Sequence, residues 1–316
     1  MNGPYKIGTL SRLTGFSPAL LRAWERRFGL ITPERGDGQQ RVYGDDDLAV
    51  LKRVRTLVDQ GRAISEIARQ GRSRLLMGGA PAPQEATEPS SSGTAEEFRK
   101  RIVSGAVALN ARDVGMALDD AFATLGAERA VSDVIVPAEV RIGELWEADR
   151  CSVASEHMAS SRFLHRLGRL LDAAQPVHEG APRVVAACFP DEHHQLGLLV
   201  LAWHLARQGV RVEYLGAAMP LDDLAKACRS SQPRALLLSV MRRPAFDRHE
   251  RDLRRQFSEA PMRVYIGGQG VPSSSKSTSR FVFVHDSPMA GIVDRIVADL
   301  DHVPRRVTGR TSRGRS

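Results

Sequence analysis

A short polar stretch follows directly after an apolar run near the middle of the chain. It reads Phe189-Pro190-Asp191-Glu192-His193-His194-Gln195-Leu196-Gly197, and the apolar run before it is Val184-Val185-Ala186-Ala187-Cys188. A run of this kind is typical of a buried strand, and the residues after the stretch have the apolar content of a helix. The pattern places an imidazole and a glycine at the end of a strand, where doubly wound sheets bind their ligands.

The stretch can be read in two registers. Asp191-x-His193 and Glu192-x-His194 both place a carboxylate two residues before a histidine. Three residues after the histidine, the first register meets Leu196 and the second meets Gly197. The spacing therefore favours an E-x-H-x-x-G motif formed by Glu192, His194 and Gly197.

Strand and helix patterns alternate along residues 183–300. Further apolar strands are predicted at residues 211–215, 235–240, 263–268 and 281–284, with helices near 195–208, 221–228 and 247–257 and a last helix ending at 300. Short apolar strands separated by helices predict a parallel sheet that is covered on both faces. We expect five βα units in a Rossmann-like, flavodoxin-like domain at residues 181–301, with Ser239 at the end of its third strand and Gly267 and Gly268 at the end of its fourth.

Residues 95–175 show helical periodicity without a strong strand signal. Four amphipathic helices predict a four-helix bundle. Trp146 lies near the end of the third predicted helix, and a polar turn separates it from Glu156 and His157 in the fourth.

The first 72 residues predict a winged helix-turn-helix. Apolar positions 7, 10 and 13 mark a first helix that Gly15 ends, and Ser17-Pro18 is a cap and first-turn proline for a second helix through Phe28. That helix carries Arg22, Arg26 and Arg27, as a recognition helix needs in a major groove. Residues 32–44 predict a hairpin wing in which Arg35, Arg41 and Tyr43 can reach a DNA backbone. Two more helices follow it.

Composition locates charge at the two ends of the chain. The net charge is +8; residues 5–72 hold thirteen Lys or Arg against eight Asp or Glu, and residues 301–316 hold five against one. Residues 73–94 are rich in Pro, Gly, Ser and Ala and predict a flexible linker, while residues 302–316 predict a disordered basic tail. Basic ends beside a neutral body indicate a polyanionic partner.

Three scattered cysteines indicate neither disulfides nor a zinc site. The absence of a long apolar run predicts a cytoplasmic protein without a membrane contact.

These residues carry two resemblances to known families. Leu21-Arg22-Ala23-Trp24-Glu25-Arg26-Arg27-Phe28-Gly29-Leu30, followed by Arg41-Val42-Tyr43, resembles the winged helix-turn-helix of the MerR family of transcription regulators. That resemblance implies DNA contacts by Arg22, Arg26, Arg35, Arg41 and Tyr43. The E-x-H-x-x-G motif with Ser239, Gly267 and Gly268 resembles cobalamin-binding domains, although Met241 stands where their S-x-L or S-x-T motif has Leu or Thr.

The second resemblance implies a set of cofactor contacts. His194 would be the lower ligand to cobalt, Glu192 would hold its imidazole, and the glycines would leave room for the displaced nucleotide tail. Trp146 with Glu156 and His157 is similar to the helical caps of B12-binding transcription regulators, where the tryptophan packs over the group bonded to cobalt. The predicted architecture is thus α plus α/β: winged helix-turn-helix at 1–72, linker at 73–94, helical cap at 95–175, and Rossmann-like domain at 181–301.

The same domain order is similar to that of light-responsive regulators of carotenoid synthesis. It implies a DNA-binding repressor, not an enzyme. In such a repressor adenosylcobalamin assembles a dimer or tetramer on the operator, and light releases the protein from DNA. RNA polymerase or an antirepressor would be further partners. Some light-sensing members carry a histidine directly after the cap tryptophan, and this chain has Glu147 there. The alternatives are a regulator whose C-terminal domain binds no cobalamin and acts through protein contacts or another tetrapyrrole, and a corrinoid enzyme module, which would lack the DNA-binding head.

Overall fold

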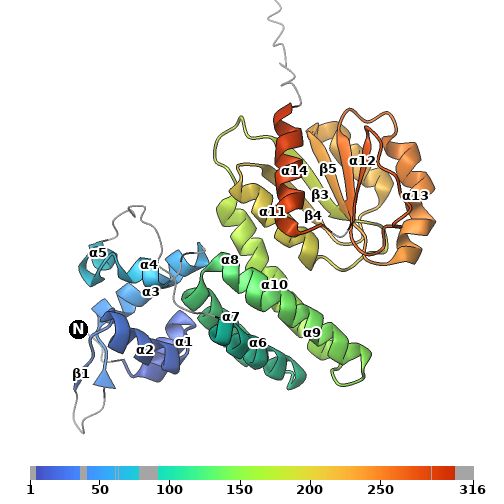
Figure 1. Cartoon of the computed structure of the whole chain (residues 1–316). Coiled ribbons are helices and arrows are strands. Elements are labelled where there is room, and N and C mark those ends of the chain that lie inside the picture. Colours follow the sequence, from blue (N-terminus) through green and yellow to red (C-terminus); the bar gives the residue numbers. More distant parts are fainter. Residues whose placement is uncertain are drawn as a thin grey trace, which may run out of the picture. The chain divides into compact units, whose positions relative to one another are not determined.

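The computed structural model of the chain describes residues 5–35, 41–60, 62, 64–77, 92–285 and 287–302. The chain divides into two compact units, Met1–Ala173 and Ala174–Ser316, which we describe separately (Figure 1). Among the helices formed by the described residues, none has the length and hydropathy that a membrane crossing requires.

The first unit begins with the predicted helix-turn-helix. Helix α1 (Ile7–Thr14) ends at Gly15, whose φ of +80° is the left-handed conformation that glycine adopts without strain. Helix α2 (Pro18–Phe28) is capped by Ser17, whose Oγ accepts a hydrogen bond from the Leu20 amide at 3.2 Å. The turn between the two helices is therefore Gly15, Phe16 and Ser17.

A small wing and three helices complete the head of the chain, by which we mean residues 5–77. Strands β1 (Glu34–Arg35) and β2 (Arg41–Val42) pair antiparallel, and helices α3 (Asp45–Asp59), α4 (Ile64–Ala68) and α5 (Arg72–Met77) follow. The buried Phe16 and Trp24 rings meet edge to face, with centroids 4.7 Å apart. Leu13, which the periodicity placed on the inner face of α1, is instead 51% exposed. Ser11 and Thr14 occupy the inner face in its place.

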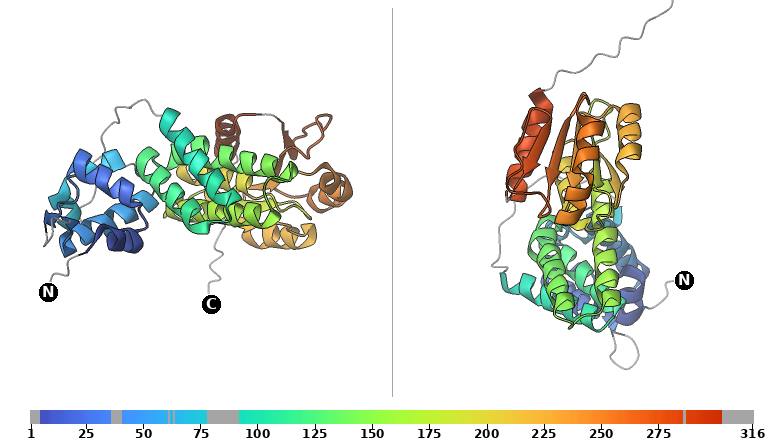
Figure 2. Two further views of the ribbon diagram at one scale, coloured as in Figure 1. Left: turned by 90° about the horizontal axis from the view of Figure 1, so that it is seen from below. Right: turned by 90° about the vertical axis from the view of Figure 1, so that its right-hand side faces the viewer.

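A bundle of helices forms the rest of the first unit. It consists of α6 (Ser92–Val107), α7 (Ala111–Leu125), the short α8 (Ala127–Arg129), a π-helical segment (Ala130–Ile135), α9 (Val136–Glu147) and α10 (Val153–Ala174). Helix α6 packs against both α7 and α9 (Figure 2). The bundle prediction is confirmed, but the third predicted helix is built from three pieces of which one is a π-helix.

The linker prediction is corrected at both of its ends. Residues 73–77 belong to α5, where Leu75 is buried, and residues 92–94 already belong to α6. Residues 78–91, and the predicted tail from residue 303 onward, lie outside the described residues.

The second unit is a parallel five-stranded sheet in the order β4-β3-β5-β6-β7. Its strands are β3 (Arg183–Cys188), β4 (Arg211–Gly216), β5 (Ala235–Ser239), β6 (Arg263–Gly267) and β7 (Phe281–Val284), and its helices are α11 (Leu196–Arg207), α12 (Leu221–Ser231), α13 (Arg243–Phe257) and α14 (Met289–His302). Helices α11 and α14 pack together on one face of the sheet, and α12 and α13 on the other (Figure 1).

Alternate strand residues supply the core beneath α12 and α13. They include Val185, Leu236, Leu238, Val264 and Ile266, all buried. Apolar side chains on both faces explain why the strands read as continuous apolar runs. The five predicted strands and four predicted helices are all present, but they make four βα units instead of five, because β6 leads into β7 through residues 268–280, which contain no α-helix.

Candidate functional site: a histidine at the sheet's switch point and an arginine-bearing head

The predicted motif residues of the second unit gather at the carboxyl ends of three neighbouring strands. Cys188, the last residue of β3, pairs in register with Ser239 at the end of β5, and Ser239 pairs with Gly267 at the end of β6. The first strand of this sheet, β3, lies between β4 and β5, so the strand order reverses there. That is the switch point at which open α/β sheets bind ligands.

Glu192 and His194 are joined in the loop between β3 and α11. The fully buried Glu192 accepts hydrogen bonds through Oε1 from His194 Nδ1 at 2.5 Å and from the His194 backbone amide at 3.0 Å. The His194 side chain itself is 63% exposed. Because Nδ1 is held by the carboxylate, Nε2 is the nitrogen that the ring presents to a ligand.

The second oxygen of Glu192 ties the loop to the neighbouring strand end. Oε2 accepts hydrogen bonds from the backbone amides of Met241 at 2.7 Å and Arg242 at 3.0 Å. Burial by itself raises the pKa of Glu192, but these hydrogen bonds and those from His194 outweigh it, and the pKa is lowered. The group is therefore an ionised carboxylate that positions both the histidine and the loop after β5.

The competing register has a different use in the structure. Asp191 has a φ of +61°, and its carboxylate pairs with Arg248 at 2.6 Å and His249 at 3.1 Å, both on α13. His193 is exposed. Asp191 therefore anchors the loop to α13. The carboxylate that holds a histidine within the motif is Glu192, which pairs with His194 as the position of Gly197 predicts.

The glycines of the site differ in what surrounds them. A side chain on Gly268, whose φ is +109°, would place its Cβ 2.2 Å from the Val240 carbonyl oxygen, so this position requires glycine. A Cβ on Gly197 would meet no atom within 4 Å. Gly268 thus lets two loops approach closely, and Gly197 borders open space next to His194.

Sequence reasoning missed three contributors to this site. The Met241 and Arg242 amides hold Glu192, and a Cβ on Gly270 would lie 2.8 Å from the Arg242 backbone. The glycine spacing Gly267-Gly268-x-Gly270 is the signal that could have indicated the close approach of two loops.

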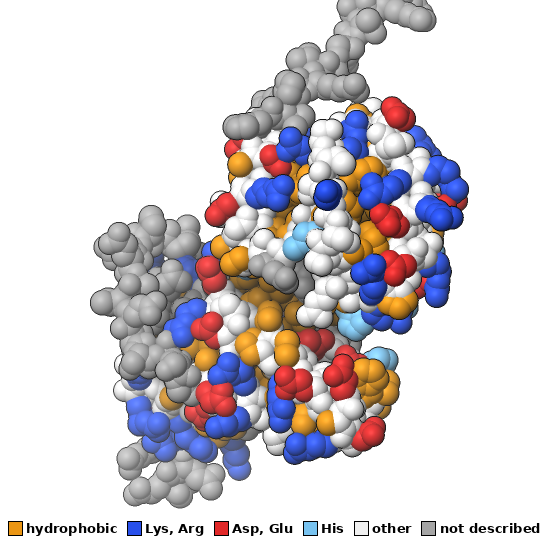
Figure 3. Space-filling model, turned by 45° about the vertical axis from the view of Figure 1, so that its right-hand side comes forward, with side chains coloured by type: hydrophobic (Ala, Val, Ile, Leu, Met, Phe, Trp, Pro, Cys, Tyr) orange, Lys and Arg blue, Asp and Glu red, His pale blue; other side chains and the backbone are white. Residues whose placement is uncertain are grey.

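In the bundle, the predicted cap residues lie at the adjoining ends of α9 and α10. The Trp146 residue is 45% exposed, and the His157 side chain is 74% exposed. His157 Nδ1 contacts Glu156, whose other oxygen accepts a hydrogen bond from Ser160 Oγ at 2.7 Å. Val153, the first residue of α10, is also exposed, and hydrophobic side chains reach the surface of the bundle in the space-filling view (Figure 3). This end of the bundle therefore presents an apolar surface with an oriented imidazole.

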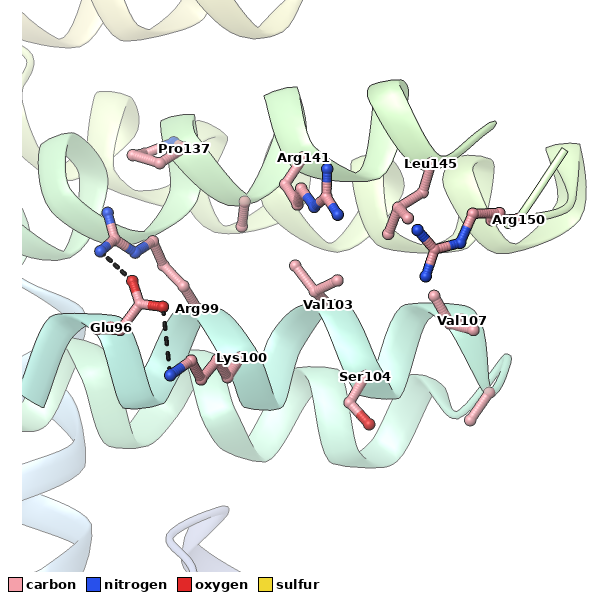
Figure 4. Close-up of a pocket in the computed structure, with 12 residues that line it drawn as sticks. Glu96, Arg99, Lys100, Val103, Ser104, Val107, Pro137, Arg141, Leu145 and Arg150 are labelled. Atoms are coloured by element: carbon pink, nitrogen blue, oxygen red, sulfur yellow. Dashed lines mark hydrogen bonds and ion pairs between the residues drawn. The ribbon is translucent and has the colours of Figure 1, made fainter. Parts of the chain in front are cut away.

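A groove of about 830 Å³ lies elsewhere on the bundle, between α6 and α9 (Figure 4). Apolar residues that include Val103, Val107 and Leu145 line it, together with the cations Arg99, Lys100, Arg141 and Arg150. Arg99 and Lys100 both pair with Glu96. Trp146, Glu156 and His157 are not among the residues that line the groove, although Leu145, which precedes Trp146, is one of them.

The predicted DNA contacts of the head divide into exposed and buried groups. Arg22 and Arg26 are exposed on α2, and Arg41 is exposed on the wing, where it pairs with Glu25 at 2.9 Å. The Arg35 side chain lies outside the described residues. Tyr43 is fully buried, and its hydroxyl donates a hydrogen bond to Glu25 at 3.1 Å. This differs from the predicted backbone contact: Tyr43 positions the glutamate that holds Arg41.

Comparison with known proteins matches each part of the chain. Residues 5–70 match the MerR HTH family of regulatory proteins, and residues 94–171 and 182–283 each match a B12 binding domain. The HTH-type transcriptional repressor CarH of Myxococcus xanthus is 36% identical over 85% of this chain and 90% of its own length. The chain belongs to the CarH-like MerR regulators with B12-binding domains.

A second repressor of the same organism agrees with this membership. The repressor CarA of Myxococcus xanthus is 34% identical over 86% of this MerR regulator and 89% of its own length. Among solved structures, the monomethylamine corrinoid protein of Methanosarcina barkeri covers 66% of the chain and 99% of its own, with 14% identity and a TM-score of 0.49. The family is one of DNA-binding transcription regulators whose B12-binding domains bind cobalamin.

Proposed function

We propose that this regulator is a repressor whose oligomerisation and operator binding are controlled by adenosylcobalamin. The pair formed by Glu192 and His194 carries the proposal. An exposed imidazole with Nδ1 fixed by a buried carboxylate is the arrangement that metal-ligating histidines share. His194 would hold the cobalt of a corrin as its protein ligand.

The residues around His194 fit such a group. Gly197 leaves open space beside the histidine, and Gly267 and Gly268 end the neighbouring strand without side chains. In this proposal His194 Nε2 would be the lower ligand, and the glycines would border the nucleotide tail. Ser239, nearly buried at the end of β5, would contribute a hydroxyl to the same edge of the sheet.

Trp146, Glu156 and His157 would contact the upper face of the cofactor. Adenosylcobalamin, when bound, supplies a cobalt–carbon bond that light can break. Trp146 offers an exposed aromatic surface to the group on that bond, and Glu156 holds the His157 ring in one orientation. Glu147 follows the tryptophan where some light-sensing members of the family carry a histidine, so His157 is the imidazole of the cap that could face cobalt after light exposure.

Control of DNA binding follows from a shift in population. A ligand that binds one assembly better than another shifts the equilibrium only by that difference in affinity. If the cobalamin-bound protein forms the dimer or tetramer, two or more heads bind the operator together. The affinity of the assembly for DNA then rises although each head makes the same contacts as before. The exposed Arg22, Arg26 and Arg41 supply the attraction to phosphates.

The experiment uses the full chain with adenosylcobalamin in the dark. After free cofactor is removed, the absorption spectrum, the elution volume and the affinity for DNA are recorded before and after green light. We expect retained corrin colour, a larger species in the dark, and loss of that species on illumination. Protein that keeps no colour would refute cobalamin control, whereas retained colour with unchanged size and DNA affinity would refute only the light switch.

Two variants assign the ligand. His194→Ala should shift the spectrum of the bound cofactor and weaken its retention. His193→Ala removes an exposed neighbour with the same chemistry and should leave both unchanged. Equal effects of the two substitutions would exclude His194 as the specific lower ligand.

A further inference from the structure

Two adjacent carboxylates of the bundle contact the DNA-binding head. Asp119 and Asp120 lie in the middle of α7, and both are buried. Asp120 Oδ1 accepts a hydrogen bond from the backbone amide of Ser17 at 3.3 Å, and Asp120 Oδ2 pairs with Arg101 at 2.9 Å. Ser17 is the residue that caps the recognition helix, so the bundle binds the chain where that helix begins.

Asp119 binds the head through a second contact. Its two oxygens pair with the two terminal nitrogens of Arg55 on α3, at 2.7 and 3.0 Å. The guanidinium of Arg55 also lies over the Phe16 ring, 5.4 Å from its centroid. A Cβ on Gly15 would lie 3.0 Å from Asp119 and 3.1 Å from Arg55. The turn of the helix-turn-helix is thus enclosed by this ion pair.

Helix α10 adds two arginines to the same cluster. Arg166 pairs with Asp119 and, at 3.0 Å, with Asp59 on α3, while Arg169 pairs with Asp59 at 2.5 Å. Burial is the main reason that the pKa of Arg166 is lowered to about 10. Bidentate and shared arginine–carboxylate contacts fix an orientation more strictly than single exposed pairs.

The contact leaves the DNA-facing residues accessible. Arg22 and Arg26 on α2 are exposed while Ser17 and Arg55 are engaged. Docking of the head is therefore compatible with DNA binding, and it fixes the direction in which the recognition helix points from the bundle. Two docked heads in one assembly would then meet DNA at a set distance and rotation, which is what selects half-site spacing.

We infer that Asp119 and Asp120 are positioning residues for DNA recognition: they dock the head on the bundle and thereby set the half-site spacing that the assembled protein accepts. The inference rests on the proposed operator binding by an assembly. The docking of the head on the bundle does not depend on that proposal, and a separate experiment measures it. We expect Asp119 and Asp120 to affect the free energy of DNA binding through geometry, because both carboxylates are buried.

The first measurement is amide hydrogen exchange of the full chain. Asp119→Asn/Asp120→Asn keeps the shape of both side chains and removes both charges. We expect exchange of the segment containing Gly15, Phe16 and Ser17 to become at least tenfold faster, with α13 unchanged. Asp113→Asn, an exposed position on the same helix whose partner is Asn110, is the matched control. Unchanged exchange in the double variant would refute docking.

The second measurement is binding to duplexes that carry two copies of a half-site selected by the wild-type protein from random DNA. Five added base pairs rotate one half-site by about half a turn. We expect them to weaken wild-type binding at least tenfold and to weaken binding by the double variant less than threefold. Affinity for a single half-site should be equal in both proteins. If the double variant does not fold, Arg169→Gln serves in its place, because it removes only the partly exposed pair with Asp59. We expect it to give an intermediate loss of discrimination between the two spacings.

The outcomes separate the two proposals. If no duplex is selected, operator binding fails, and the exchange measurement still decides docking. If DNA binds but the double variant discriminates spacing as strongly as the wild-type protein, or the wild-type protein accepts both spacings, the positioning role is overturned.

Discussion

The buried carboxylate of Glu192 holds the imidazole of His194 through Nδ1 at 2.5 Å. The same carboxylate also accepts hydrogen bonds from the amides of His194, Met241 and Arg242, so four donors share its two oxygens. The orientation of an exposed ring is therefore determined by a group that solvent does not reach.

Glu192→Gln should weaken both the loop and the ligand site. The amide keeps one acceptor oxygen and turns an NH₂ toward groups that are themselves donors, which costs about 1–3 kcal/mol of unfolding free energy. Loss of a group that orients a metal ligand typically weakens binding about 10–100-fold. Cobalamin titration followed by absorbance, with Asp191→Asn as the control for the neighbouring carboxylate, measures the second effect. An affinity equal to the wild-type value would contradict it.

Acid should destabilise the second unit through the same residue. The folded-state pKa of Glu192 lies below its ordinary value of 4.5, so its contribution to stability is complete above that value. It is lost as the pH falls through the lowered folded-state pKa. Urea unfolding between pH 7 and pH 3 should show a steeper loss for the wild-type protein than for Glu192→Gln. Parallel curves would show that Glu192 does not contribute.

Two glycine substitutions should act in opposite directions. Gly268→Ala forces a Cβ against the Val240 carbonyl at a positive φ and should lower the unfolding free energy by more than about 2 kcal/mol. Gly197→Ala lies in helix α11 with open space around it and should raise the unfolding free energy by about 0.5–1 kcal/mol. Cobalamin affinity should nevertheless fall in Gly197→Ala if the cofactor occupies that space. A stabilised variant with unchanged affinity would place the cofactor elsewhere.

Arg22→Ala and Arg26→Ala should weaken DNA binding without loss of stability. Each side chain is exposed on α2, and the removal of one phosphate contact lowers the slope of log K against log salt by about 1. Arg112→Ala, an exposed arginine of the bundle, is the matched control. Binding isotherms at several salt concentrations measure the slope. A slope that changes equally in all three variants would indicate that only the net charge matters.

Tyr43→Phe distinguishes a buried role from a DNA contact. The hydroxyl donates to Glu25, and burial, with a smaller effect of Glu25, raises the pKa of Tyr43 to about 12. Its removal should cost about 0.5–1.5 kcal/mol of unfolding free energy. DNA affinity should change less than twofold, because the side chain does not reach the surface. Tyr5→Phe, which removes a hydroxyl bound to Asp45 at 2.9 Å, is the control.

Local spacing in the sequence was sufficient to predict the Glu192–His194 register and the capped recognition helix. Both depend on residues within a few positions of one another. The docking of Asp120 on Ser17 joins residues 103 positions apart, and no periodicity reports such a pair. The burial of Tyr43 has a similar cause, because it depends on a hydrogen bond to Glu25 and a backbone pairing with Tyr5, both distant in sequence.

The pairing of Asp119 with Arg55 also bears on how such proteins can be recombined. A head taken from another MerR protein would need a cation at the place of Arg55 and a carboxylate at the place of Asp59 to engage this bundle. Without them, Asp119 and Arg166 would be left buried with fewer opposite charges. A chimera joined between the head and α6 would therefore need compensating substitutions on α3, even though its recognition helix and its B12-binding domain were each intact.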